Sequence, residues 1–271
     1  MLAALGCSSD QGETTTDVWE PFAGALADTQ RRNLTSEITG GTYQISVALP
    51  ENYASSNKTY PILYAVDANA QFGTVVEAAR LLRLDETVPE LVIVGIGYPV
   101  GRFTNASELR AVDICGRGDR EAFLEFIRQE LIPLVESEFR VNSAGRALYG
   151  HSCGAGFALH ALLEGEGTFE RVIAASPGTR SALQLESAYA ESHDSLRAQL
   201  FLSSGLLSEG FWPEDVPGIK ELVTILESRN YKELQVKTAY FENETHMSVI
   251  PAAISRGLRA IYEDFPSVVS Q

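Results

Sequence analysis

Cysteines, basic residues and long apolar runs are scarce in this sequence, and each shortage excludes a class of protein. Three cysteines in 271 residues cannot form a disulfide-rich framework. The 21 basic residues stand against 36 acidic ones, a net charge of −15, and no basic cluster could neutralise nucleic-acid phosphates. No apolar run reaches the roughly 18 residues of a membrane span. With 45% hydrophobic residues, the chain can bury the core of one enzyme-sized domain.

The beginning of the chain differs from the rest. Residues 1–7 are mostly apolar and end at Cys7, and the polar run of residues 8–16 follows. This arrangement resembles the end of a bacterial lipoprotein signal, in which Cys7 would carry a lipid anchor. We therefore expect residues 1–19 to be a tail and residues 20–271 to form one domain. We also expect an exported protein, periplasmic or lipid-anchored, with the cytoplasm as the alternative.

Apolar runs typical of strands alternate with segments of helical spacing. Residues 33–38 and 43–49 flank Gly40-Gly41 and predict an antiparallel hairpin. Further buried strands are predicted at residues 62–66, 91–96, 147–149, 172–175, 200–203 and 236–240. Helices are predicted at residues 71–84, 120–139, 157–163, 218–228 and 248–262. The alternation predicts an α/β fold with a mostly parallel sheet and helices on both faces. The polar residues 178–195 are expected to form a short lid or a surface excursion.

The segment Gly150-His151-Ser152-Cys153-Gly154 follows a predicted strand and precedes a predicted helix. This is the context of the G-x-S-x-G nucleophile elbow, in which a sharp turn exposes a serine. Side chains at the two glycine positions would collide with neighbouring residues. The helix N-terminus favours negative charge that develops on a substrate oxygen. We predict that Ser152 is a catalytic nucleophile, and a glycine turn that only packs is the alternative.

A serine nucleophile needs a base, and the chain has four histidines. His151 lies inside the elbow, where its side chain points away from the hydroxyl of Ser152. His160 is expected to be a packed or surface residue of the following helix, and His193 lies in the polar segment. Only His246 follows the final predicted strand, in the order serine, acid, histidine that α/β-hydrolases use. We predict that His246 is the base.

The acid that orients this base is expected after the penultimate strand, which we place at residues 199–203. Glu209 is the first carboxylate in the loop that follows and is our prediction. Asp215 is the second choice, and Glu214 could also take the role.

Three segments together resemble the putative esterase family of α/β-hydrolases. They are residues 60–67, the elbow around Ser152, and Thr245-His246-Met247-Ser248, and the resemblance covers nearly the whole chain after the tail. The family includes siderophore esterases, S-formylglutathione hydrolases, feruloyl esterases and mycolyltransferases. The resemblance implies an α/β-hydrolase fold and a serine carboxylesterase that uses no metal and no organic cofactor.

The resemblance also implies further site residues. The acid of the family is often a glutamate, as Glu209 would be. The oxyanion hole of the family uses the backbone N–H of the residue after the nucleophile, here Cys153, and a second N–H near Asn69. Ala68 stands where the family usually has glycine, which affects the shape of the pocket.

The segment Arg110-Ala111-Val112-Asp113 resembles the R-x-x-D loop of the family, near the active site. We expect Arg110 to pair with Asp113, with substrate binding by Arg110 as the alternative. Cys115 follows this loop, and Cys153 adjoins the nucleophile. We expect two independent reduced thiols. A bridge between them, formed after export, would instead clamp the loop over the site.

Together these residues predict hydrolysis of carboxylic esters through an acyl-enzyme. The negative net charge would repel a strongly anionic substrate, which favours small neutral esters. Acyl transfer to an alcohol and a siderophore-type esterase are the alternatives among enzymes. A binding or scaffold protein with an inactive hydrolase fold is the alternative outside them.

Overall fold

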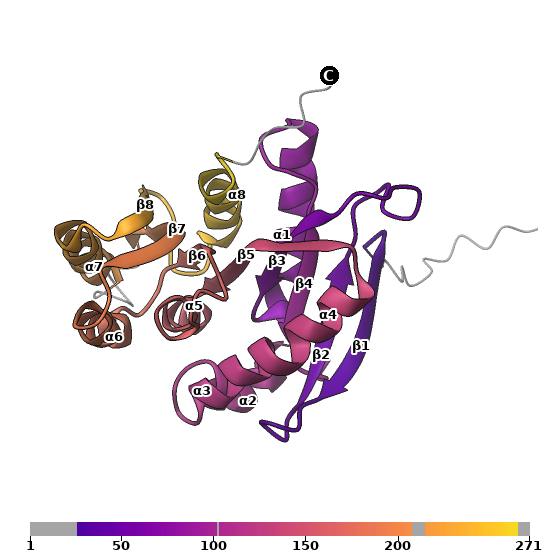
Figure 1. The fold of residues 1–271 in the computed structure, drawn as a ribbon, viewed down its shortest axis with the longest axis horizontal. Helices are drawn as coiled ribbons and strands as arrows, with labels where there is room; N and C mark the ends of the chain where they lie inside the picture. Colours follow the sequence, from indigo (N-terminus) through magenta and orange to yellow (C-terminus); the bar gives the residue numbers. More distant parts are fainter. Residues whose placement is uncertain (1–25, 102, 208–214, 265–271) are drawn as a thin grey trace, which may run out of the picture.

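The computed structural model describes residues 26–101, 103–207 and 215–264. Within these ranges an eight-stranded sheet has the order β1-β2-β4-β3-β5-β6-β7-β8 (Figure 1). The strands are β1 (Thr29–Thr35), β2 (Thr42–Ala48), β3 (Tyr60–Ala65), β4 (Val92–Gly97), β5 (Val141–His151), β6 (Arg171–Ala175), β7 (Ser195–Gly205) and β8 (Lys232–Phe241). β2 is antiparallel to both β1 and β4, and the other neighbours are parallel. The predicted parallel sheet with an N-terminal antiparallel hairpin is confirmed.

Helices cover both faces of this sheet (Figure 1). They are α1 (Ala68–Leu84), α2 (Ser107–Asp113), α3 (Arg120–Glu125), α4 (Ile132–Glu138), α5 (Cys153–Glu164), α6 (Arg180–Ala190), α7 (Asp215–Arg229) and α8 (Ile250–Ile261). A 3-10 turn, Phe103–Ala106, precedes α2, and a π-helical segment, Phe126–Leu131, joins α3 to α4. No helix in the described ranges is long and apolar enough to cross a membrane.

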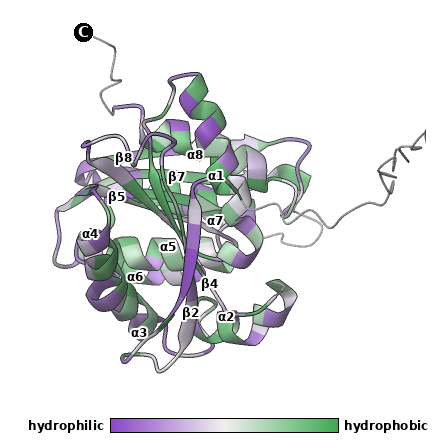
Figure 2. Ribbon diagram, turned by 90° about the vertical axis from the view of Figure 1, so that its right-hand side faces the viewer, coloured by the Kyte–Doolittle hydropathy of each residue, from purple (hydrophilic) through white to green (hydrophobic). Residues whose placement is uncertain are grey.

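Alternation along the strands divides the core between the two faces. In β3, Ile62 and Tyr64 belong to the core beneath α3 to α7, whereas Leu63 and Ala65 belong to the core beneath α1 and α8. All four side chains are buried, as expected for a parallel strand covered on both sides. The central strands are largely hydrophobic, and the helices mix hydrophobic and hydrophilic residues (Figure 2). Because both faces are covered, the site must lie at an end of the strands.

The polar segment of residues 178–195, expected to be a short lid or a surface excursion, contains helix α6, which the sequence did not predict. Glu186 obscured the helical pattern, because it is a charged residue at a buried position. Its carboxylate accepts hydrogen bonds from the Nε of Arg229 and the hydroxyl of Tyr231, at 3.0 and 2.9 Å. A buried charge of this kind is retained only with such partners, and these come from α7 and from the residue before β8.

Candidate active site

The nucleophile elbow lies at the carboxyl end of the central strand β5. This strand ends at His151, α5 begins at Cys153, and Ser152 between them has φ 58° and ψ −121°. A positive φ is strained for serine, and strain of this kind is common at functional sites. A Cβ atom on Gly150 would overlap the carbonyl oxygen of Gly154. The structure thus confirms the strand–turn–helix context and the need for glycine.

His246 follows β8, and hydrogen bonds fix both its ring and its backbone. Its Nδ1 atom lies 3.0 Å from Oδ2 of Asp215, the first residue of α7, and both side chains are buried. The carbonyl oxygen of His246 accepts a hydrogen bond of 2.7 Å from Nε2 of His151. A carboxylate at Nδ1 fixes the imidazole tautomer in which Nε2 can accept a proton.

Among the described residues, Asp215, the second choice of the sequence analysis, is the carboxylate that lies at the imidazole of His246. Our first choice, Glu209, and the further candidate Glu214 lie outside the described residues. Chain order admits any carboxylate that follows β7. The contact with His246 is decided by where α7 begins, because its apolar side chains pack in the core and fix the position of its first residue.

The other three histidines have different surroundings. Burial lowers the pKa of His151 to about 4, so its ring is neutral and its Nε2–H donates to the carbonyl described above. His160 contacts Glu121 at 3.1 Å, and His193 stacks on Tyr189 with ring centroids 4.0 Å apart. None of the three lines the cavity that contains the nucleophile.

The first turns of α1 and α5 meet at this end of the sheet. A Cβ atom on Gly154, in α5, would lie 3.1 Å from Oδ2 of Asp67, the residue before α1. Cys153 and Asn69 lie in these two first turns, whose backbone N–H groups have no acceptor within their helix. The amide side chain of Asn69 holds α1 to the end of β4, because it accepts from Tyr98 N at 2.7 Å. Cys153 lines the cavity that contains the nucleophile, and the role of these two N–H groups as oxyanion donors stays a prediction.

Arg110 pairs with Asp67, so the predicted pair with Asp113 is wrong. Its Nε and Nη2 atoms lie 2.6 and 2.8 Å from the two carboxylate oxygens of Asp67. Burial raises the pKa of the Asp67 carboxyl, and the guanidinium opposes that rise. Asp113 instead accepts a hydrogen bond of 3.1 Å from the hydroxyl of Tyr98. Asp67 is the more deeply buried of the two carboxylates, so an unpaired charge there would cost more free energy, and it is the one that pairs with Arg110. Arg110 is not among the described residues that line the cavity.

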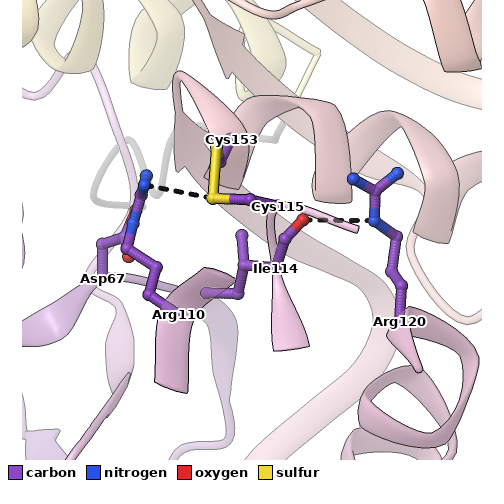
Figure 3. The surroundings of a disulfide bond; sticks show 6 residues. All are labelled: Asp67, Arg110, Ile114, Cys115, Arg120 and Cys153. Carbon is purple, nitrogen blue, oxygen red and sulfur yellow. Dashed lines mark hydrogen bonds and ion pairs between the residues drawn. A yellow bond between two sulfur atoms is a disulfide. The ribbon is translucent and has the colours of Figure 1, made fainter. Parts of the chain in front are cut away.

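Cys115 and Cys153 form a disulfide bond, with Cα atoms 4.9 Å apart (Figure 3). The expectation of two reduced thiols is therefore wrong. Sequence alone could not settle the pairing, because the two cysteines are 38 residues apart and meet only when the connection after α2 lies against the start of α5. Nη1 of Arg110 also donates to Sγ of Cys115 at 3.3 Å. The disulfide thus joins the connection between α2 and α3 to the residue after the nucleophile.

Replacement of Cys115 by serine is expected to lower the free energy of unfolding by about 2–4 kcal/mol, because the bridge restricts the unfolded chain. Denaturant unfolding would measure the change, with Cys7→Ser as the matched control that leaves the bridge intact. Thiol counting on the unfolded, non-reduced protein should find no free thiol from Cys115 or Cys153. Two free thiols from these positions, or equal stability of the two variants, would contradict the bridge.

A cavity of about 250 Å³ joins these groups. Ser152, His246, Asp215 and the bridged cysteines line it together with residues that the sequence analysis missed, namely Arg120, Gly156, Ser176, Gly178, Arg180 and Ser181. Arg120 gave no signal in the sequence, because an arginine that opens a predicted helix is ordinarily exposed.

Two further observations bear on the chemistry of the cavity. Ser152 and His246 are both described, and their side chains form no hydrogen bond with each other in this structure. Contacts of this kind are often long until a substrate is bound. In the part of the chain that the structure describes, no group of three or more His, Cys, Asp or Glu side chains could hold a metal ion.

Comparisons with known proteins show the family of this chain. Residues 36–246 match the family described as Putative esterase. The siderophore triacetylfusarinine C esterase of Aspergillus fumigatus is 31% identical, over 84% of this chain and 91% of the relative. The ferri-bacillibactin esterase BesA of Bacillus subtilis is 28% identical, over 89% of this chain and 92% of the relative. The structure of the siderophore hydrolase EstB from Aspergillus nidulans has a TM-score of 0.77 at 26% identity, over 91% of this chain and 99% of that one.

The family match spans most of the chain, from the hairpin to His246, and includes the elbow with Ser152. The relatives match over nearly their whole length, so the similarity is not confined to one motif. The chain therefore belongs to the putative esterase family of α/β-hydrolases and hydrolyses carboxylic ester bonds.

Proposed function

We propose that Ser152, His246 and Asp215 form the catalytic triad of this esterase. The observation that carries the proposal is the hydrogen bond of 3.0 Å between His246 Nδ1 and Asp215 Oδ2, in the same cavity as Ser152. A serine on a nucleophile elbow, with a histidine that a carboxylate orients, is the arrangement of serine hydrolases.

The reaction proceeds in two halves on these side chains. Oγ of Ser152 attacks the carbonyl carbon of the ester while Nε2 of His246 takes the hydroxyl proton. The tetrahedral intermediate then breaks its bond to the alcohol oxygen, and His246 returns the proton to the leaving alcohol. Water attacks the acyl-enzyme in the same way and releases the carboxylic acid. Asp215 stabilises the charged imidazole and does not take the proton itself.

Backbone N–H groups of Cys153 and Asn69 stabilise the oxyanion of both tetrahedral intermediates. Each donor belongs to a helix start that a side chain holds in place. The disulfide ties Cys153 to the connection before α3, and the Asp67–Arg110 pair ties the start of α1 to α2. Donors fixed in advance stabilise the developing charge without reorganisation during the reaction.

Siderophore esters are the substrate class that the relatives support for this cavity. The fungal and bacterial relatives are named for esters of siderophores, and each matches most of this chain. A panel of aryl, feruloyl, thio and siderophore esters tests the assignment. We expect kcat/KM for a siderophore ester to exceed that for a short aryl ester by about 10-fold or more, since selective pockets discriminate at least this strongly.

The same panel separates the alternatives. A preference for the feruloyl ester or the thioester would contradict the siderophore assignment while leaving the triad intact. A new ester formed when an alcohol is added would indicate acyl transfer. A rate that does not depend on Ser152 would contradict the triad itself.

We further propose that the protein is exported. The disulfide between Cys115 and Cys153 supports this location, because structural disulfides persist in oxidising compartments. Lipid attachment at Cys7 would then hold the enzyme at a membrane surface, provided more than one acyl chain is attached.

A further inference from the structure

Arg120 is one of two cationic side chains, with Arg180, that line the cavity and are not used by the proposed triad. It lines the cavity together with Ser152 and His246. No carboxylate among the described residues forms an ion pair with it, whereas Arg110 nearby is held by Asp67. Arg120 is thus a cation in the cavity of the nucleophile, and no ion pair with a described carboxylate balances its charge.

The acidic residues on either side of Arg120 are engaged elsewhere. Asp119 caps α3, because its Oδ1 accepts a hydrogen bond of 2.9 Å from the backbone N of Ala122. Glu121 contacts His160 at 3.1 Å. The carboxylate that shares the cavity, Asp215, bonds to the imidazole of the proposed base. Each of these acidic side chains therefore contacts another group and does not pair with Arg120.

The guanidinium of Arg120 has a fixed position. Its Nε donates a hydrogen bond of 3.1 Å to the carbonyl oxygen of Ile114, and its two terminal nitrogens point away from that carbonyl (Figure 3). Gly116 leaves space for the group, since a Cβ atom there would lie 3.1 Å from Nη2. Cys115, between these two residues, is bridged to Cys153. The disulfide therefore sets the position of Arg120 relative to the nucleophile.

Burial makes this arrangement costly without an anion. Arg120 is half-buried, and burial lowers the pKa of its guanidinium, although an arginine stays protonated in proteins. A desolvated charge is normally paired, and carboxylates and similar oxyanions match the planar fork of arginine. The net charge of −15 would repel such a group at a distance, so an acidic enzyme needs a local cation to hold one.

We propose that Arg120 binds an anionic oxygen group of the ester substrate, such as a carboxylate. The inference rests on the proposed function, because it assigns a charge to the substrate of the same cavity. It also revises the expectation from net charge, which favoured neutral esters.

Two pairs of esters that differ only in charge test the proposal. For the acyl side, these are mono(4-nitrophenyl) adipate and its adipamide counterpart. For the alcohol side, these are 4-carboxyphenyl butyrate and 4-carbamoylphenyl butyrate. Arg120→Gln should lower the ratio of kcat/KM between the anionic and the neutral ester by about 10–100-fold in at least one pair, the range of a hydrogen bond to a charged group. Arg117→Gln is the matched control, because Arg117 is exposed on the same loop and its replacement changes the net charge equally.

Binding to Ser152→Ala gives a readout that does not need turnover. Calorimetry with the same four esters should show tighter binding of an anionic ester, and this preference should disappear in Ser152→Ala/Arg120→Gln. Equal loss for the anionic and neutral esters, or no change in either ratio, would overturn the assignment and indicate that Arg120 only supports the loop. If turnover did not depend on Ser152 but binding remained selective for the anionic ester, the proposed function would be contradicted and the anion-binding role of Arg120 would be supported.

Discussion

Replacement of Ser152 by alanine is expected to abolish labelling by a fluorophosphonate probe and to lower ester turnover by roughly 10⁴–10⁶-fold. The proposed reaction forms its covalent bond at Oγ, so the variant retains only the contributions of the oxyanion donors and of binding. The measurements are gel-based labelling and hydrolysis of a chromogenic short-chain ester. The elbow backbone should survive the change, because alanine accepts the turn at φ 58° about as well as serine does.

His246→Ala is expected to match Ser152→Ala closely, because nucleophile and base act as one unit. His193→Ala is the control, since His193 is exposed and stacks on Tyr189 outside the cavity. Labelling that persists in Ser152→Ala would rule out Ser152 as the nucleophile. Normal turnover in His246→Ala together with loss of turnover in His193→Ala would identify His193 as the base.

The fold followed from local patterns wherever those patterns reflect burial. The runs in β3 and β4 are apolar because helices cover both faces of the sheet, so their strands could be predicted from residues alone. Helix α6 could not, because Glu186 is buried through partners 43 and 45 residues away. Helical spacing is judged from residues close in sequence, whereas this buried ion pair joins residues that are close only in the folded structure.

Some residues of the candidate site could likewise be predicted from local patterns, and others could not. The elbow was predictable because one sharp turn requires both of its glycines. His246 was predictable because it is the histidine that comes last in the chain order and follows the last strand. The partner of Arg110 lies 43 residues away, and the disulfide joins residues separated by 38. Several acids satisfy chain order equally, so the choice among them required the position of α7. Arg120 became visible only through the cavity that it shares with the nucleophile.

Asp215→Asn is expected to lower turnover on the order of 10⁴-fold or somewhat less, with little effect on folding. Asparagine has nearly the same shape as aspartate, but its amide cannot stabilise the charged imidazole and can hold the ring in the wrong tautomer. The loss should be smaller than for Ser152→Ala, because the acid orients the base and takes no proton. Measurements of kcat and of the unfolding temperature for each variant would separate catalysis from stability.

Glu209→Gln and Glu214→Gln are the matched controls, because each removes one carboxylate from the segment before α7 and nearly preserves side-chain size. Both are expected to retain near-normal turnover, since the contact with Nδ1 of His246 is made by Asp215 at 3.0 Å. If Glu209→Gln were inactive and Asp215→Asn active, the acid would be Glu209, as chain order first predicted. A moderate loss in both would mean that the two carboxylates share the imidazole. Because each would then partly replace the other, the double variant would lose at least the sum of the two single losses in free energy.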